Sequence, residues 1–397
     1  MSTGKIKLCC DFFTKRSFHE EPWQRFVMFN GPEDVYTLHP KVKKTTLAEC
    51  LPGDNVFFML YLSPRESHMF FMEMEDSFYQ RLRDLDAKIL LNHEGFNLFT
   101  YGDNIFNHPF ALDVREHLYW KIKKFLGGKG IPEHKLYFIH SAQGYLDEIK
   151  KMRTTKVQWF DAPYHVKSKH LQCNLFLPWM NTVKVQVENP GFDYKYSALF
   201  GGRPTQFRYD ILKSLHHKGL LSYGKNSMKQ YAGGDAEFDS KLPITYDGVV
   251  DRWWEKNYNE TYVFKDIFLW VVGETFVPNG YPNFSEKTVR AIIYERPFVV
   301  FGHPGTLKYL HELGFKTFSD FWDESYDSEP DQNKRISMIV DIVDDVCKHP
   351  NLNQLYKDMQ SVIQHNKQKV TETDYIQQVY DFLNDTLTCK THYWNGQ

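Results

Sequence analysis

The sequence has little of what marks a secreted, membrane-spanning or zinc-binding protein. Its six cysteines are scattered and include no C-x-x-C pair, so neither a zinc site nor a disulfide framework is predicted. Residues 1–13 lack the apolar core of a signal peptide, and the longest apolar run, 56–62, is far shorter than the ~20 residues of a membrane-spanning helix. These absences predict reduced thiols, a cytoplasmic location and no membrane span.

The chain also lacks an excess of positive charge. Its 48 Lys and Arg against 50 Asp and Glu give a net charge of −2, whereas sequence-independent nucleic-acid binders carry a large basic excess. The charge is nevertheless uneven. Segment 190–232 holds seven Lys and Arg against two acidic residues, and segment 317–346 holds nine acidic residues against two basic ones. The basic segment therefore either faces an anionic ligand or forms a solvated helix face.

Apolar and aromatic residues are abundant. The 397 residues are 42% hydrophobic and 16% aromatic, which is ample for a large core and leaves rings that could stack on a sugar or base. This length predicts two domains, or one fold built from two halves. Turn residues gather between Pro178 and Gly202, so we place the boundary there and predict domains 1–188 and 189–397.

Strand and helix patterns alternate in both halves, which predicts an α/β fold with parallel sheets. The predicted strands are 26–29, 56–62, 87–91, 135–140, 268–272 and 297–301. The predicted helices are 78–86, 117–125, 208–221, 285–295, 305–313 and 335–347, followed by a helical segment 352–387.

The most informative stretch is 284–305. Ser285 precedes an apolar helix as a cap, Glu286 and Lys287 stand in its first turn, and a buried strand leads to the turn 302–305 and a second helix. Helix N-termini at the carboxyl ends of parallel strands favour anions such as a diphosphate. Glu286 could accept from two ribose hydroxyls while Lys287 neutralises phosphate; the alternative is a capping Glu beside a solvated Lys.

This stretch resembles the donor-binding core of GT-B glycosyltransferases, especially fucosyltransferase-like enzymes. The residues that carry the resemblance are Ser285-Glu286-Lys287-Thr288, the strand Arg-Pro-Phe-Val-Val and the Gly302–Gly305 turn. The continuation, ending in Asp-Glu-Ser-Tyr-Asp at 323–327, is similar to glycosyltransferase-like proteins of bacteriophages. The resemblance spans residues 195–345, although Thr is commoner than Ser at position 285.

The resemblance implies two Rossmann-like domains that face a cleft, with C-terminal helices. The second domain would bind a nucleotide-sugar and the first an acceptor, in the host cytoplasm if the enzyme is phage-encoded. Stretch 203–221 resembles the same group, and its arginines near a helix N-terminus need an anion unless they pair with segment 317–346. Glu274 would bind sugar hydroxyls or cap the following loop. The predicted donor-binding residues are Arg203, Arg208, Glu274, Ser285, Glu286, Lys287, Thr288, Gly302 and Gly305.

Catalysis of this kind needs a general base within reach of the acceptor hydroxyl. Glu94 is the first candidate and His93 the second, because they follow a predicted buried strand; the alternative for Glu94 is a solvated turn residue. His140 and Ser141 end the next strand, and Asp161 is a weaker candidate. The Asp84-Leu85-Asp86 motif lies in a helical stretch that directs its carboxylates apart, so no metal site is predicted.

The sequence leaves the acceptor and two other classes of function open. If the phage resemblance holds, the acceptor is a hydroxymethylated base in DNA or a surface glycan. The net charge argues against DNA, whereas segment 190–232 argues for it. No cofactor is predicted beyond the nucleotide-sugar as co-substrate, with the leaving diphosphate stabilised by Arg208, Arg203 and Lys287. The alternatives are a non-catalytic nucleotide- or glycan-binding protein and another nucleotide-dependent transferase.

Overall fold

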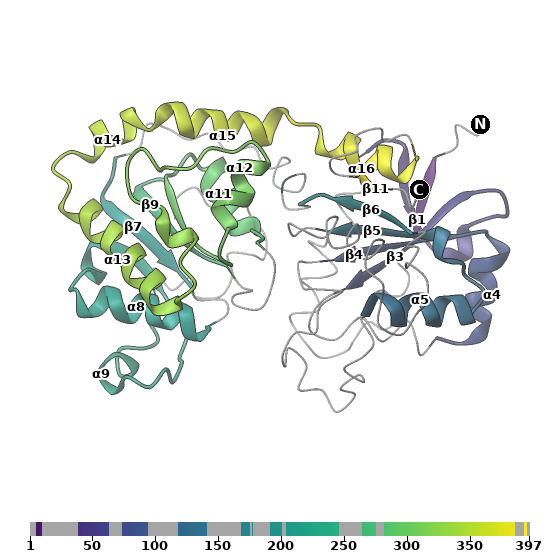
Figure 1. Ribbon diagram of the computed structural model, residues 1–397, viewed down its shortest axis with the longest axis horizontal. Helices are drawn as coiled ribbons and strands as arrows, with labels where there is room; N and C mark the ends of the chain where they lie inside the picture. The colour runs from purple at the N-terminus through teal and green to yellow at the C-terminus, as the bar shows by residue number, and fades with distance from the viewer. Residues whose placement is uncertain are drawn as a thin grey trace, which may run out of the picture. The chain divides into compact units, whose positions relative to one another are not determined.

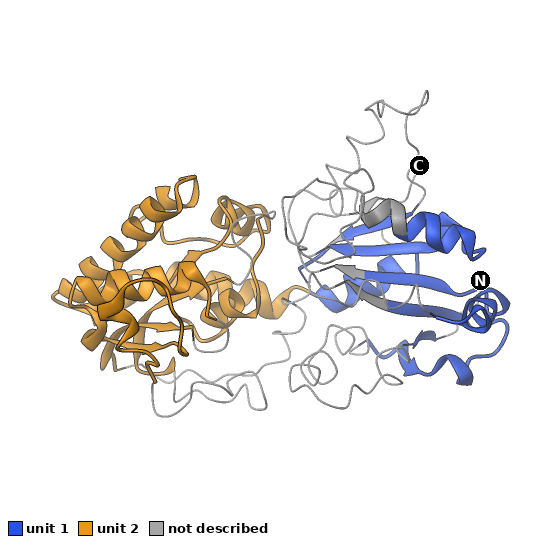
Figure 2. Ribbon diagram, turned by 90° about the horizontal axis from the view of Figure 1, so that it is seen from below, with its two compact units in different colours: residues 1–179, 279–281, 374–397 blue, residues 180–278, 282–373 orange. Residues whose placement is uncertain are grey.

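The computed structural model divides the chain into two compact units (Figure 2). Unit 1 comprises residues 1–179, 279–281 and 374–397, and unit 2 comprises 180–278 and 282–373. The structure describes residues 5–9, 39–62, 74–93, 118–140, 168–174, 177, 191–200, 204–245, 264–274, 282–385 and 393–394. Each unit is an α/β structure with a parallel sheet, compatible with a Rossmann-like arrangement in two domains (Figure 1).

The sheet of unit 1 has the strand order β11-β6-β5-β4-β3-β1-β2. All neighbouring strands are parallel except β11, which is antiparallel to β6. Its strands are β1 (Ile6–Cys9), β2 (Val42–Thr45), β3 (Asn55–Leu62), β4 (Lys88–His93), β5 (Leu136–His140), β6 (Lys169–Gln172) and β11 (Tyr393–Trp394). The central strands read as apolar runs because both faces of the sheet are buried.

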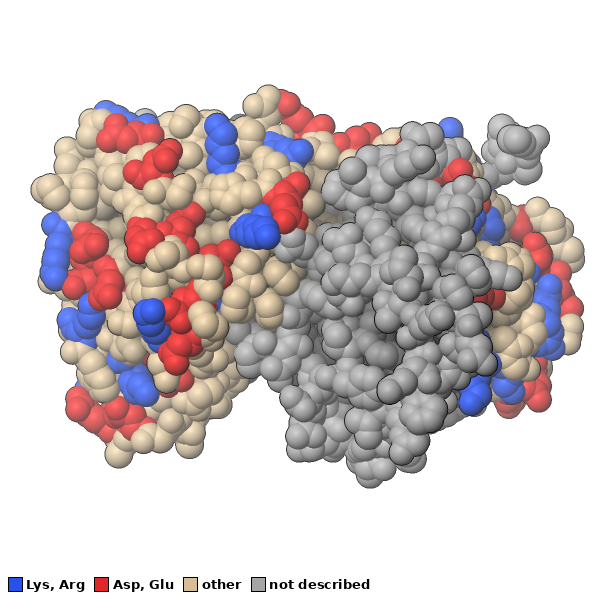
Figure 3. All heavy atoms as spheres, in the orientation of Figure 1, with Lys and Arg blue, Asp and Glu red and all other residues tan. Residues whose placement is uncertain are grey.

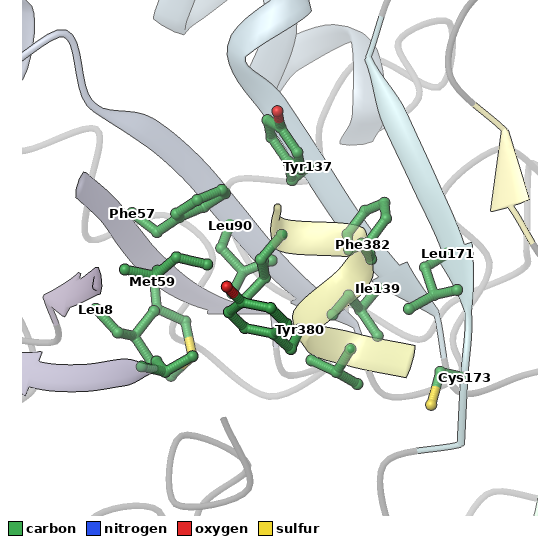
Figure 4. Packing of buried hydrophobic residues seen from close by; sticks show 14 residues of the cluster. Leu8, Phe57, Met59, Leu90, Tyr137, Ile139, Leu171, Cys173, Tyr380 and Phe382 are labelled. Carbon is green, nitrogen blue, oxygen red and sulfur yellow. The ribbon is translucent and has the colours of Figure 1, made fainter. Parts of the chain in front are cut away.

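The helices of unit 1 described here are α4 (Asp76–Asp84), α5 (Leu118–Gly128) and α16 (Tyr375–Leu383). The side chains of α16 complete the apolar core of the sheet, as Figure 4 shows. Tyr137 packs edge-on against Phe57 of β3 at 5.0 Å and against Phe382 of α16 at 5.5 Å between ring centroids. The end of the chain thus packs with the first unit, whereas the sequence places it in a domain 189–397.

The sheet of unit 2 is parallel with the order β10-β9-β7-β8. Its strands are β7 (Tyr194–Leu199), β8 (Gly224–Ser227), β9 (Ile267–Gly273) and β10 (Phe298–Phe301). Its helices are α8 (Gln206–His217), α9 (Ala236–Asp239), α11 (Glu286–Ile293), α12 (Thr306–Glu312), α13 (Gln332–Lys348), α14 (Leu352–Asp358) and α15 (Gln360–Glu372).

Helices cover both faces of this second sheet. Phe301 stacks on Phe207 of α8 at 5.1 Å, so α8 lies on the face to which Phe301 points. Trp270 pairs with Phe298, which points to the opposite face, and contacts Tyr294 at the end of α11. A doubly wound sheet of this kind leaves the carboxyl ends of its strands to bind ligands.

Both sheets begin with the same strand order. The second strand lies on one side of the first and the third on the other, giving β2-β1-β3-β4 in unit 1 and β8-β7-β9-β10 in unit 2. Successive strands are therefore added first on one side and then on the other, and this reversal of strand order lies between β1 and β3 in unit 1 and between β7 and β9 in unit 2. In open α/β sheets, ligands bind at the carboxyl ends of the strands at such switch points.

Most elements predicted from the sequence are present with shifted ends, and strand 26–29 lies outside the described residues. Strands β1, β2, β6, β7, β8 and β11 were not predicted. The sequence of β8, Gly-Lys-Asn-Ser, has no apolar pattern. Lys225 of β8 is nevertheless fully buried and pairs with Asp266 at 2.5 Å, so an ion pair takes the place of apolar packing. No helix within the described ranges is long and apolar enough to cross a membrane.

Candidate functional site

Most predicted donor-binding residues lie at the carboxyl edge of the unit 2 sheet. Glu274 directly follows β9, Gly302 directly follows β10, and Ser285 is the N-cap of α11. Arg208 stands on the first turn of α8, which follows β7. Arg203 lies outside the described residues. The fold therefore gathers residues from three separate stretches of sequence at one end of a parallel sheet.

Glu274 is buried and holds the start of α11. One carboxylate oxygen accepts hydrogen bonds from the Ser285 backbone N–H at 2.9 Å and the Thr288 hydroxyl at 2.7 Å, and the other accepts from the Ser285 hydroxyl. Only 5% of the residue is exposed. A carboxylate at a helix N-terminus satisfies otherwise orphaned donors. These are the contacts of a cap, so Glu274, Ser285 and Thr288 form the framework that positions the two residues between them.

Those two residues, Glu286 and Lys287, are partly exposed. The Lys287 ammonium donates to Glu286 Oε1 at 2.8 Å and to the Ser285 hydroxyl at 3.0 Å. Burial alone would raise the pKa of Glu286, but the charges of Lys287 and Arg290 and the hydrogen bond from Lys287 lower it to about 2. Glu286 is therefore ionised at neutral pH and acts only as a hydrogen-bond acceptor.

Arg208 is buried and bridges the β7/β9 switch point. Its Nε and Nη2 donate to the backbone carbonyl of Gly273, the last residue of β9, at 3.2 and 2.5 Å. A Cβ atom at Gly273 would lie 2.9 Å from the Phe200 ring and 3.3 Å from the Arg208 side chain. A side chain at this position would force the Phe200 ring to shift and would press on Arg208, so glycine is favoured here. Arg208 thus anchors the strand end at the place where a ligand is expected.

The basic and acidic segments of unit 2 neutralise each other in part. Lys218, after α8, pairs with Asp341 of α13 at 2.5 Å and lies 3.6 Å from Asp344. The basic residue seen to pair with segment 317–346 is therefore Lys218, rather than Arg208. Figure 3 shows basic and acidic side chains interspersed over the coloured surface. The uneven charge of the sequence therefore gives weaker support to a nucleic-acid surface.

The Gly302–Gly305 turn leads into α12. A Cβ atom at Gly302 would lie 2.7 Å from the Thr306 hydroxyl, and Gly305 has a φ of 88°, in the left-handed region that favours glycine. Asp327 holds this turn, because its carboxylate accepts from the backbone N–H groups of Leu307 and Lys308 at 3.0 and 3.2 Å. The Asp-Glu-Ser-Tyr-Asp element therefore caps α12.

His303 in this turn is a candidate functional residue that was not predicted from the sequence. Its Nδ1 lies 2.7 Å from the Pro304 carbonyl oxygen, which can only accept, so Nδ1 carries the proton and Nε2 is the acceptor in the neutral ring. Burial lowers the pKa of His303, although the residue is partly exposed. The signal available in the sequence was a histidine directly after a buried strand and before a Pro-Gly pair.

In unit 1, the predicted base falls at the edge of the described chain. His93 is the last residue of β4 and is paired in register with His140, the last residue of β5. Glu94, Ser141 and Asp161 lie outside the described residues. The two strand ends are adjacent, so the chain brings His93 and His140 to the same carboxyl edge.

His140 belongs to a buried polar chain. Its Nε2 shares a hydrogen bond with His170 Nδ1 at 2.9 Å, and His170 Nε2 shares one with the Ser168 hydroxyl at 2.8 Å. Both histidines are fully buried beside Phe138. Burial lowers the pKa of His140 to about 3 and places that of His170 well below its usual value. Both rings are therefore neutral at pH 7.

No metal-binding group is found in the described part of the chain. No set of three or more His, Cys, Asp and Glu side chains there is arranged to hold an ion. Asp84 ends α4, and Asp86 forms an ion pair with Lys135.

No family model, no curated protein and no solved structure matches this chain. The interpretation of the site therefore depends on its own residues and their arrangement.

Proposed function

We propose that the protein is a nucleotide-sugar-dependent glycosyltransferase of the GT-B type, with the donor bound by unit 2 and the acceptor by unit 1. The observation that carries the proposal is the start of α11. There, two partly exposed charged residues, Glu286 and Lys287, are held by the buried Glu274 cap at the carboxyl edge of a parallel sheet. This geometry agrees with the motif that resembles GT-B donor sites.

The charges at α11 suit the two polar parts of a nucleotide. An ionised carboxylate accepts hydrogen bonds from the two hydroxyls of a ribose, and the low pKa of Glu286 keeps it in that state. The Lys287 ammonium and the helix N-terminus favour the diphosphate. The leaving nucleoside diphosphate would then be stabilised by fixed positive groups as the sugar is transferred.

The acceptor hydroxyl would be deprotonated by Glu94 or His93 at the end of β4 while it attacks the anomeric carbon of the donor. The molecule that carries this acceptor hydroxyl would be either DNA with a hydroxymethylated base or a surface glycan. A base in duplex DNA would have to be flipped out of the stack. The pairing of Lys218 with α13 removes part of the argument for DNA, so we favour the glycan.

Glu286→Ala should weaken nucleoside diphosphate binding by about ten- to a hundred-fold, because hydrogen bonds to charged groups contribute roughly 1.5–3 kcal/mol. Inorganic pyrophosphate has no ribose and should lose much less affinity. Titration calorimetry with both ligands measures the difference. Glu372→Ala, on an exposed position of α15, serves as the control and should change neither affinity. Equal affinity of the wild type and Glu286→Ala for the nucleotide would contradict the ribose role.

The donor itself is best found with a thermal-shift screen of nucleotide-sugars. A ligand present at a hundred times its Kd stabilises the folded state by about 2.7 kcal/mol. A nucleotide-sugar that stabilises the protein can then be tested for transfer to glycans and to hydroxymethylated DNA. Binding without transfer or hydrolysis would favour a non-catalytic nucleotide-binding protein.

A further inference from the structure

Unit 2 contains two arginines, Arg296 and Arg335, that are equally buried, with 2% of each residue exposed. The guanidinium of Arg296 is well satisfied. It donates to the carbonyls of Phe264 at 3.0 Å and Lys265 at 2.9 Å, and also contacts the Tyr356 hydroxyl at 3.4 Å. This arginine therefore ties segments of unit 2 together and needs no further partner.

Arg335 differs sharply from Arg296. Its Nε donates to the Tyr326 carbonyl at 2.9 Å, and its Nη2 is buried without a hydrogen-bond partner among the described residues. The nearby carboxylate of Asp327 is occupied by two backbone N–H groups of α12 and forms no ion pair with Arg335 within the described chain. A buried guanidinium with so few acceptors is costly, because buried charges are normally paired.

The position of Arg335 points to what it lacks. Its guanidinium lies 4.7 Å from the centre of the Phe301 ring, at the end of β10 where the Gly302–Gly305 turn begins. It is also the fourth residue of α13, and a cation near a helix N-terminus opposes the helix dipole. The pKa of His303 is lowered mainly by burial and also by the charge of Arg335; His303 is partly exposed, so the guanidinium lies near a residue that reaches solvent.

We propose that Arg335 binds phosphate oxygens of a ligand at the carboxyl end of β10. Planar guanidinium nitrogens match phosphate geometry, and an anion there would supply the acceptor that Nη2 lacks among the described residues. Where the ligand is the nucleotide-sugar, the inference rests on the proposed function and assigns its diphosphate to Arg335. Arg208, already bonded to Gly273, then acts as an anchor of the strand end.

The test compares Arg335→Met with the matched control Arg296→Met, using inorganic pyrophosphate as the probe. Arg335→Met should bind pyrophosphate about ten- to a hundred-fold more weakly while its resistance to urea is unchanged or higher. Arg296→Met should keep its pyrophosphate affinity and lose stability, because it leaves several buried acceptors without donors. Titration calorimetry and urea unfolding measure the two quantities on the full chain.

The inference is overturned if the wild type binds no pyrophosphate, or if Arg335→Met binds it as tightly as the wild type. If Arg335→Met does not fold, Arg335→Lys replaces it; it keeps the charge but loses the planar donors, and an unchanged affinity would again refute the inference. Pyrophosphate binding through Arg335 without binding of any nucleoside diphosphate supports the inference and contradicts the proposed function. If the protein binds a nucleoside diphosphate and Arg335→Met binds it as tightly as the wild type, the proposed function is supported and the inference about Arg335 is contradicted.

Discussion

Glu274→Ala should lower the free energy of unfolding by about 3 kcal/mol and weaken nucleotide binding as well. Its carboxylate is the acceptor for the Ser285 backbone N–H and for the hydroxyls of Ser285 and Thr288. Each buried donor left without an acceptor costs roughly 1–3 kcal/mol. The same bonds place Glu286 and Lys287, so loosening the start of α11 should disturb the proposed ribose contact. The two effects share one cause.

Urea unfolding and calorimetric titration with a nucleoside diphosphate measure these effects. Glu274→Gln is the matched control, because it keeps the shape and one carbonyl oxygen and should retain part of the stability. If Glu274 instead contacts the sugar and contributes little to the cap, Glu274→Ala should bind donor poorly while unfolding at the wild-type urea concentration. That result would reject the capping role.

Acidification should destabilise unit 1 through His140. Its pKa is about 3 in the folded protein against about 6.5 in an unfolded chain, so the unfolded state takes up the proton first. The contribution of His140 to stability is fully present above pH 6.5 and is lost as the pH falls from there toward 3. For His140 alone the loss is about 2 kcal/mol at pH 5 and about 3 kcal/mol at pH 4. His170 should add a loss of the same sign.

His140→Leu provides the comparison. The variant removes the hydrogen bond to His170 Nδ1 and is expected to be less stable at pH 7, but its stability should fall less steeply with acidification than that of the wild type. Urea unfolding at pH 7, 6 and 5 gives both slopes. The exposed His134 offers a control, since His134→Leu should leave the wild-type slope intact. Identical slopes for His140→Leu and the wild type would show that His140 is not held neutral by burial.

Local patterns were sufficient to predict strands β3, β4 and β5 of unit 1, strands β9 and β10 of unit 2, and most of the helices. Apolar runs such as 56–59 and 297–301 form strands because they are buried on both sides of a parallel sheet. The Ser285 cap was equally readable, since its hydroxyl and the first-turn residues act within one helix turn. The strand β8 was not, because a buried ion pair with Asp266 holds it in place of apolar contacts.

The structure shows the contacts of the predicted site residues that it describes, which the sequence did not. Glu286 and Lys287 are partly exposed, and their role in binding a ligand stays a prediction, whereas Arg208 and Glu274 contact neighbouring parts of unit 2. Arg335 and His303 were overlooked. Nothing in the sequence around an arginine on an amphipathic helix shows that its guanidinium is buried against Phe301 with a nitrogen that has no partner among the described residues.

The sequence by itself determined the α/β class, the alternation of strands and helices, and the start of α11, because each depends on residues close together along the chain. Only the tertiary structure decided the shared strand order of the two sheets and the packing of α16 in the core of unit 1. It also decided which charges are paired, as between Lys218 and Asp341. These features join residues far apart in sequence, and apolar burial and ion pairing act on distance in space, which no local pattern records.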